Sequence, residues 1–294
     1  MVEKNMDADV NTEADAGYYA DLTVDMPFKK TFANEKDKEP LIVMLNVFLA
    51  KKLAYSIVDV DIKNPYVPGE TIKDRGAIFD IRCEDSQGSK FLVEVQVGKQ
   101  AYFIKRVLFY ACMAITKSGK KGKWDFNYPA VYSLSFLSFD LDFGNDDIVQ
   151  YLSLSNDNYP KIRYGYINLV FVRLGKFHKS EGECKTLQDR LMFSLRNAHR
   201  LREKPSEFNE EVFDKIFDIA RISNFTLEER DSYEAAMKNE RDRYAALKYA
   251  KEEGWEAGRE EGFGRGVKEG ATKLLTLLES GVSLPEAKRQ LGLS

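Results

Sequence analysis

Two stretches of sequence decide the fold: Ala-Ile-Phe-Asp-Ile-Arg-Cys at residues 77–83 and Phe-Leu-Val-Glu-Val-Gln-Val at residues 91–97. Both alternate apolar and polar side chains, which is the period of a β-strand with one buried face. The segment between them, Asp85-Ser86-Gln87-Gly88-Ser89, consists of turn-forming residues and contains the glycine that a tight reversal needs. The sequence therefore predicts an antiparallel hairpin centred on Gln87.

The register of this hairpin brings two carboxylates face to face. If residue 85 pairs with residue 89, then by the same count Asp80 pairs with Glu94. Directly opposed residues of an antiparallel pair point to the same face, with Cβ atoms roughly 5 Å apart. Two opposed carboxylates are destabilising unless a cation lies between them or one of them holds a proton. Gln96 shares the same face, so the pattern is typical of a small divalent-metal site.

A second interpretation of Asp80, Glu94 and Gln96 is a solvated polar face on an ordinary hairpin. Two features favour the metal site. Arg82, the only positive charge on the polar face, is predicted to lie opposite Leu92 and away from Glu94. The opposite face is apolar enough to fix the register, and with it the position of the acids. The residues of that apolar face are Phe79, Ile81, Cys83, Phe91, Val93, Val95 and Val97.

The composition limits which metal such a site can hold. With 294 residues, 44% hydrophobic and 31% charged, the chain is typical of a soluble globular protein. It contains two histidines and three widely spaced cysteines, which do not readily form a His- or Cys-based metal cluster or a disulfide framework. Carboxylates are the remaining ligands, and they suit magnesium, manganese or calcium.

Charge and hydropathy restrict the location and the partners. The net charge of −3 argues against a generally basic surface for nucleic acid, although one face can still carry a basic patch. No apolar run approaches the roughly 20 residues that a membrane span needs. The acidic N-terminal segment has no apolar stretch of the kind found in secretion signals. We therefore expect no membrane association and a cytoplasmic location, in which the cysteines stay reduced.

Four regions are predicted along the chain. An acidic N-terminal segment with little to bury is expected to be disordered. An α/β core follows, with a helix, a meander of strands, a second helix and further strands. A helical region comes next, and the tail combines a charged glycine-repeat helix with a helical hairpin. In chain order these regions are residues 1–22, 23–180, 181–253 and 254–294.

The tail has a repeat of its own, with glycine at every fourth position from Gly254 to Gly270. Glycines four residues apart line one side of a helix and let another helix approach closely. Each interior glycine also costs about 1 kcal/mol of helix stability relative to alanine. Two interpretations stay open, a flexible spacer and a helix-pairing segment. The second predicts a homo-oligomer formed through the helical C-terminal region.

Several blocks of the chain resemble a known family. Asp25-x-x-Phe28-Lys29-x-x-Phe32, together with Leu45-Asn46-x-Phe48-Leu49, resembles the opening segment of the bacterial recombination-promoting nuclease and putative-transposase family. Glu94-x-Gln96 followed by Phe103-x-x-Arg106-x-x-x-Tyr110 resembles the core of that family, which belongs to the PD-(D/E)XK nuclease superfamily. The charged tail resembles its usual C-terminus. The resemblance covers most of the chain from about Asp25.

The resemblance implies a restriction-endonuclease-like α/β fold, in which helices flank a mixed sheet and an all-α extension follows. It also implies a DNA endonuclease that depends on Mg²⁺ or Mn²⁺, with Asp80 and Glu94 as metal ligands. The backbone carbonyl of Val95 is a predicted further ligand. Gln96 departs from the lysine of the superfamily. An amide can orient a water or a phosphate oxygen, but it brings no charge and cannot act as a general base.

Three further residues are predicted to serve the site. Glu39, at the start of the first long helix, is expected to reach the site and orient a water. The alternative is an exposed acid in a first helical turn. Lys29 and Arg106 are the predicted phosphate contacts to DNA. The alternatives are a solvated lysine and a helix-surface ion pair of little energetic consequence.

Two functions follow from these expectations. The first is a metal-dependent DNA endonuclease, a phosphodiester hydrolase of the recombination-promoting or transposase-like type. The second is a catalytically weak or inactive member of the family that acts as a DNA-binding or assembly protein through its helical tail. Gln96 and the acidic net charge favour the second.

Overall fold

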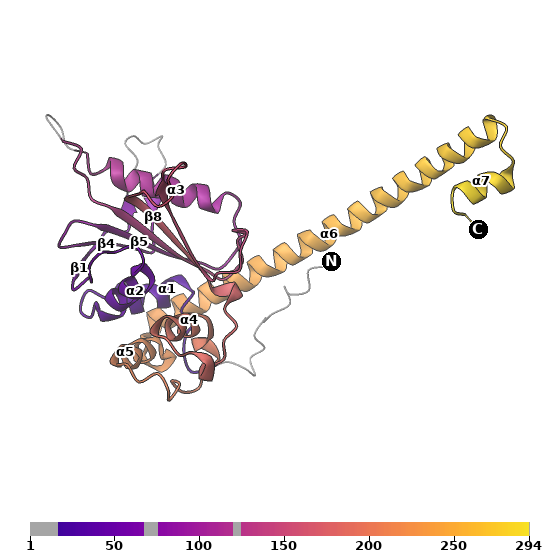
Figure 1. Ribbon diagram of the computed structural model, residues 1–294. Helices are drawn as coiled ribbons and strands as arrows, with labels where there is room; N and C mark the ends of the chain where they lie inside the picture. Colours follow the sequence, from indigo (N-terminus) through magenta and orange to yellow (C-terminus); the bar gives the residue numbers. More distant parts are fainter. Residues whose placement is uncertain (1–16, 68–75, 120–124, 294) are drawn as a thin grey trace. The chain divides into compact units, whose positions relative to one another are not determined.

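The computed structural model describes residues 17–67, 76–119 and 125–293 (Figure 1). The chain divides into two compact units, residues 1–236 and 237–294. The first unit contains the sheet and all of the predicted site residues.

The first unit is built on a six-stranded mixed sheet in the order β1-β4-β5-β6-β8-β7. The pairs β5/β6 and β6/β8 are parallel, and the other neighbouring strands are antiparallel. The strands are β1 (Val60–Lys63), β4 (Ile81–Asp85), β5 (Lys90–Gln96), β6 (Val131–Leu137), β7 (Val149–Ser155) and β8 (Arg163–Arg173). A separate antiparallel pair joins β2 (Tyr66–Val67) to β3 (Ala77–Ile78).

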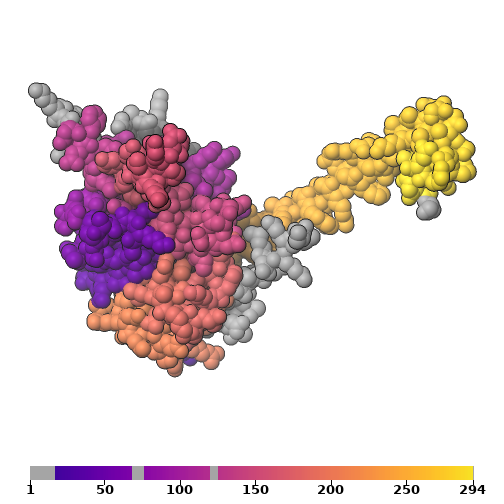
Figure 2. Space-filling view, in the orientation of Figure 1, coloured from indigo at the N-terminus to yellow at the C-terminus, as the bar shows by residue number. Residues whose placement is uncertain are grey.

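Helices cover both faces of this sheet. Four helices pack on one face, which we call the α1 face: α1 (Asp25–Phe32), α2 (Glu39–Leu49), α4 (Leu187–Asn197) and α5 (Glu211–Ala220). A single helix, α3 (Phe103–Thr116), packs on the opposite face, which we call the α3 face. Figure 2 shows the indigo surface of the N-terminal helices beside the orange surface of α5. The predicted fold class, an α/β mixed sheet flanked by helices with a helical C-terminal extension, is confirmed.

The predicted register of the hairpin is also confirmed. Ile81 pairs with Val93 and Arg82 pairs with Leu92, as that count requires. The pairing begins at Ile81, however, so Asp80 lies at a bend outside the ladder and is not the strand partner of Glu94 that the sequence predicted. At the turn, the Asp85 amide donates to the Ser89 carbonyl at 3.1 Å. Gly88 has a φ of +81°, a conformation that favours glycine.

One residue of the predicted apolar face lies on the other side of the sheet. Phe79 was predicted to share the face of Ile81, but it packs on the α3 face against Tyr110, with ring centroids 5.4 Å apart. The chain bends at Asp80, so the alternation of sides is interrupted between Phe79 and Ile81. The polar face that carries Glu94 is covered by α3, which leaves that residue 8% exposed, so the alternative of a solvated polar face does not hold at Glu94.

The predicted disordered segment, residues 1–22, extends too far toward the core. Residues 1–16 lie outside the described part of the chain, but residues 17–22 are packed. Tyr19 forms a β-bridge with Arg221, and the side chains of Tyr19 and Leu22 are buried. This packing depends on the helical region some 200 positions later in the sequence, so the local composition gave no sign of it.

The second unit contains most of α6 (Leu227–Glu279) and all of α7 (Leu284–Gln290). Helix α6 begins in the first unit and continues through every glycine of the four-residue repeat. Gly281, with a φ of +86°, lies in the turn that separates the two helices. Short 3₁₀ turns occur elsewhere at Leu174–Lys176, Glu181–Glu183, Ala198–Arg200 and Ile222–Asn224. Among the described residues, no helix combines the length and the apolar character required to cross a membrane.

Candidate metal centre

Asp80 lies at the bend that precedes β4, beside the end of β5. Its Oδ2 accepts a hydrogen bond from the Val95 backbone amide at 2.7 Å. Because β4 pairs with β5 only from Ile81 onward, the carboxylate satisfies an amide that the neighbouring strand does not reach. This bond fixes the Asp80 side chain at the edge of β5, next to the position of Glu94.

Glu94 lies inside the sheet, between β4 and β6, and faces α3. The register sets it beside Ser135 of β6. Among the described residues, its Oε2 is buried and has no hydrogen-bond partner. The closest cation is Arg106, whose Nη2 lies 3.6 Å from that oxygen, which is too long for a hydrogen bond. A buried carboxylate oxygen without a partner is costly, so the position is suited to a ligand or a cation.

The surroundings hold both carboxyl groups near neutral pKa values. Burial raises the pKa of Glu94 to about 7; Arg106 opposes the shift, and the charge of Asp80 adds to it. Burial also raises the pKa of Asp80 to about 6, opposed by the Val95 amide and by Lys29 and increased by Asp25. Burial is thus the main reason why both acids are harder to ionise, and a neighbouring carboxylate adds to the shift in each case, Asp25 for Asp80 and Asp80 for Glu94.

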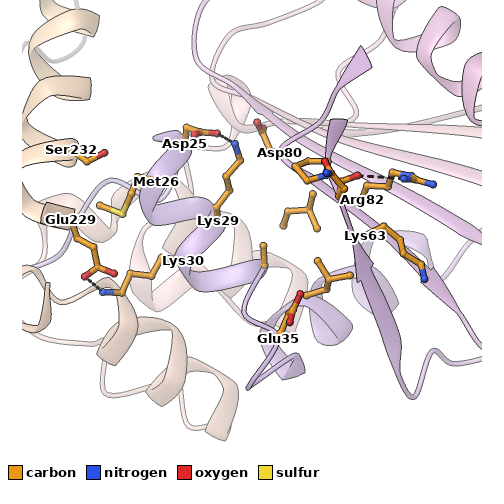
Figure 3. A pocket seen from close by; sticks show the side chains of 15 residues that line it. Asp25, Met26, Lys29, Lys30, Glu35, Lys63, Asp80, Arg82, Glu229 and Ser232 are labelled. Atoms are coloured by element: carbon orange, nitrogen blue, oxygen red, sulfur yellow. Dashed lines mark hydrogen bonds and ion pairs between the residues drawn. The ribbon is translucent and has the colours of Figure 1, made fainter. Parts of the chain in front are cut away.

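A third acid, Asp25 of α1, lies beside Asp80. It lines the same cavity as Asp80, its charge raises the pKa of Asp80, and its carboxylate pairs with Lys29 at 2.6 Å, one helical turn away. Figure 3 shows Asp25, Lys29 and Asp80 together at the wall of a cavity of about 770 Å³. In the sequence, Asp25 stood out only as part of a family motif and was not predicted to belong to the site. Its spacing of four from Lys29 was visible, but its proximity to Asp80 depends on how α1 packs.

The cavity gives access to this side of the site. Its lining includes Asp25 and Lys29 of α1, Asp80 and Arg82 of the hairpin region, and Lys63 of β1. Glu229 and Ser232, from the first turns of α6, complete its far wall. The Lys29 side chain is 35% exposed, so its ammonium group is available to a ligand in the cavity. The structure thus brings Lys29 into the same cavity as Asp80, while its role as a phosphate contact stays a prediction.

Gln96 and Arg106 form a connected pair on the α3 side. Arg106 Nη2 donates to Gln96 Oε1 at 3.0 Å, and the same guanidinium contacts the Gln100 side chain. The Gln96 amide nitrogen donates to the Gly98 carbonyl at 3.2 Å. Both polar ends of the amide are therefore engaged. Gln96 carries no charge itself, but it holds the guanidinium group of Arg106 near Glu94.

Glu39 lies in a different set of contacts from the other predicted residues. It begins α2, and its carboxylate pairs with Lys215 of α5. Lys215 also lies 3.4 Å from Asp37, so these residues join α2 to α5. The role of Glu39 in orienting a water stays a prediction, while Asp25 is the acid that a helix brings to Asp80.

The donor set fits a small hard cation. Within the described residues, no group of three or more His, Cys, Asp and Glu side chains is arranged to hold a metal by itself. Magnesium, however, is commonly bound by one or two carboxylates, with waters and substrate phosphate as the remaining ligands. Asp80 and Glu94 supply two such carboxylates, and the Glu94 carboxylate is buried without a full set of hydrogen-bond partners. A bound cation would also favour the charged form of each acid, which burial disfavours.

Comparison with known proteins agrees with this geometry. A family model described as PD-(D/E)XK nuclease family transposase matches residues 22–250. No curated protein and no solved structure matches the chain at a significant level. The matched range contains the whole sheet, α1 and α3, and therefore every residue that forms the site around Asp80 and Glu94. On this evidence, the chain belongs to the PD-(D/E)XK nuclease transposase family.

Proposed function

We propose that the chain is a Mg²⁺-dependent DNA endonuclease of the recombination-promoting type. The observation that carries the proposal is the Glu94 carboxylate, which is buried with one oxygen unpartnered next to a second carboxylate, Asp80. Membership of a nuclease family supports phosphodiester hydrolysis as the reaction. When bound, Mg²⁺ or Mn²⁺ supplies a Lewis acid for the phosphate oxygens and lowers the pKa of a water nucleophile.

Each residue of the candidate site has a separate role in this proposal. Asp80 and Glu94 hold the cation, and the Val95 carbonyl is a further ligand. The Val95 amide orients Asp80 through the 2.7 Å hydrogen bond, so β5 contributes to both acids. Gln96 keeps Arg106 in position at the α3 side. Asp25 adds negative charge on the cavity side, and we regard it as better supported than Glu39 as the acid from a helix.

DNA would approach through the cavity on the α1 side. Lys29 lines that cavity beside Asp80 and can exchange its contact with Asp25 for a phosphate oxygen. Arg106 is the second proposed phosphate contact, and its side chain is 32% exposed. These contacts concern the backbone of DNA, so they carry no sequence preference.

A second function has its own support. Gln96 takes the place of the superfamily lysine, and its amide is fully engaged by Arg106 and Gly98. It is therefore not free to act on a water. A catalytically weak or inactive protein that binds DNA, or serves in assembly through its helical tail, would have this arrangement.

Plasmid nicking separates the two functions. We expect the purified full chain to nick supercoiled plasmid with Mg²⁺ or Mn²⁺, and Asp80→Ala to lose this activity. Asp59→Ala is the matched control, because Asp59 is exposed and pairs with Lys38. DNA binding without nicking, unchanged by Asp80→Ala, would support the second function instead.

A homo-oligomer formed through the C-terminal region stays part of the proposal. A Cβ added at Gly258 or Gly262 would meet only open space within the described structure, so larger side chains are tolerated in a single chain. We expect the double variant Gly258→Leu/Gly262→Leu to dissociate the oligomer in analytical ultracentrifugation while its helix content is kept. An unchanged mass would remove the glycines from the interface. A cytoplasmic location also stays a prediction.

A further inference from the structure

Three buried polar atoms without hydrogen-bond partners meet on the α3 face of the sheet. Among the described residues, these are Glu94 Oε2, Ser135 Oγ and Arg106 Nε. Two measured relations bring them together. Arg106 Nη2 lies 3.6 Å from Glu94 Oε2, and Ser135 is the direct register partner of Glu94 on the neighbouring parallel strand. Register partners in a sheet point to the same face and lie about 4.8 Å apart.

The three groups are chemically complementary. The Glu94 carboxylate oxygen is an acceptor, the Arg106 Nε–H is a donor, and a serine hydroxyl can do both. Ser135 is completely buried at the centre of the sheet, with Phe171 of β8 as its register partner on the other side. A buried hydroxyl without a partner costs about 1–3 kcal/mol, so an alanine of nearly the same shape would serve a purely structural role better. The hydroxyl therefore points to a task at this position.

We infer that Ser135 is a positioning residue for the proposed metal ligand Glu94. Among the described residues of this structure neither Ser135 Oγ nor Glu94 Oε2 has a hydrogen-bond partner, and with a cation bound the Ser135 hydroxyl would donate to the Glu94 carboxylate. Arg106 lies on the same side, with Nη2 3.6 Å from Glu94 Oε2. Hydrogen bonds to a ligating carboxylate fix its orientation, and losing one commonly weakens metal binding about 10- to 100-fold. The inference rests on the proposed function and adds a residue that no sequence motif marks.

The neighbouring serine provides a matched control. Ser133 lies two residues earlier on β6, on the same face, and is 5% exposed. Its register partner on β5 is Leu92, so it has no carboxylate to orient. Ser133→Ala and Ser135→Ala therefore remove the same hydroxyl from the same strand, and only the second removal affects the site.

The test is the affinity of the full chain for Mn²⁺, measured without DNA by electron paramagnetic resonance of the free ion. We expect Ser135→Ala to weaken binding at least about tenfold, Ser133→Ala to bind like wild type, and Ser135→Thr to keep most of the affinity. Thermal unfolding of the metal-free variants checks the fold. We expect Ser135→Ala to unfold at or above the wild-type temperature, since it removes an unpaired hydroxyl.

Three results would overturn the inference. If wild type binds Mn²⁺ but Ser135→Ala binds within twofold of it, Ser135 is only a small residue that fills space. If both alanine variants weaken binding equally, the effect comes from the strand and not from the hydroxyl. If wild type neither binds Mn²⁺ nor nicks plasmid, the proposed function fails, and the role of Ser135 fails with it.

Discussion

Asp80 and Glu94 carry the same chemical group but meet different surroundings on the two sides of one site. Asp80 faces the open α1 side, beside a cavity and with a backbone amide as its partner. Glu94 faces the closed α3 side, where α3 covers it and one of its oxygens has no partner. The open side can admit a substrate, whereas the closed side sets the pKa and the orientation of the proposed metal ligand Glu94. The comparison teaches that the two acids should respond differently to the same substitution.

The largest expected effect concerns activity and tests whether the closed side is needed at all. We expect Glu94→Gln to reduce plasmid nicking on the order of 10³-fold, since about 4 kcal/mol of transition-state stabilisation by the metal would be lost. Glu84→Gln is the control, because Glu84 lies on the same face of the hairpin but at its other end, opposite Lys90. Equal losses in both variants would point to the sheet and not to the site.

The second effect concerns stability and pH in the metal-free protein. Burial raises the pKa of Glu94 to about 7, so the folded state binds more protons than the unfolded state between about pH 4.5 and 7. Stability from this group is therefore present at low pH and lost as the pH rises through 7. In EDTA at pH 8 we expect Glu94→Gln to be more stable than wild type by about 3 kcal/mol, an advantage that vanishes near pH 5.

Chemical denaturation at several pH values measures this difference. Asp80→Asn should gain less than Glu94→Gln, because the Val95 amide already stabilises the charged form of Asp80. Added Mg²⁺ should stabilise wild type and neither variant, since a ligand that binds only the folded state shifts the equilibrium toward it. If Glu94→Gln is less stable than wild type at pH 8, burial does not destabilise the charged form of Glu94 as we infer.

The third effect concerns the open side. We expect Asp25→Asn to weaken Mn²⁺ binding about tenfold, since it removes a negative charge beside Asp80. Glu39→Gln provides the comparison between the acid that the sequence predicted and the acid that the packing brings to the site. If Glu39→Gln weakens binding and Asp25→Asn does not, the sequence prediction is right and our assignment of Asp25 is wrong.

The smallest effect concerns Arg106, whose charge acts on Glu94 although the two side chains form no hydrogen bond. Its guanidinium opposes the rise in the pKa of Glu94, so Arg106→Gln should raise that pKa further. The acidic limb of the pH–activity profile should then move to higher pH, with a loss of less than about tenfold at pH 6. Arg106→Lys should restore part of the profile. A uniform loss at all pH values would instead favour Arg106 as a phosphate contact alone.

Part of the fold was predictable because it depends on local patterns. Alternation along residues 77–83 and 91–97 and the turn at Gly88 gave the hairpin and its register, since a slip by one residue would expose an apolar face. Strand β7 was missed, because its residues 149–155 alternate weakly and are only half-buried at an edge of the sheet. The packed segment 17–22 was missed for the opposite reason, because its partner is distant in the sequence.

The candidate site shows the same division. Asp80, Glu94 and Gln96 were found because two strands joined by a tight turn have a fixed register. Asp25 was missed, since no local pattern reports which helix end lies against a strand end. Ser135 was missed as well, because β5 and β6 are joined through α3, and a parallel pairing between distant strands has no signature in a turn.

The sequence by itself therefore determined the hairpin, its register and the family, because period, turn chemistry and motif spacing act over a few residues. Only the tertiary structure decided how those acids are solvated. The packing of α1 opened one side and brought Asp25 and Lys29 to Asp80, while the packing of α3 closed the other over Glu94. Burial, charge and unpartnered atoms depend on every neighbour in space, so the chemistry of the site follows from the fold and not from the motif alone.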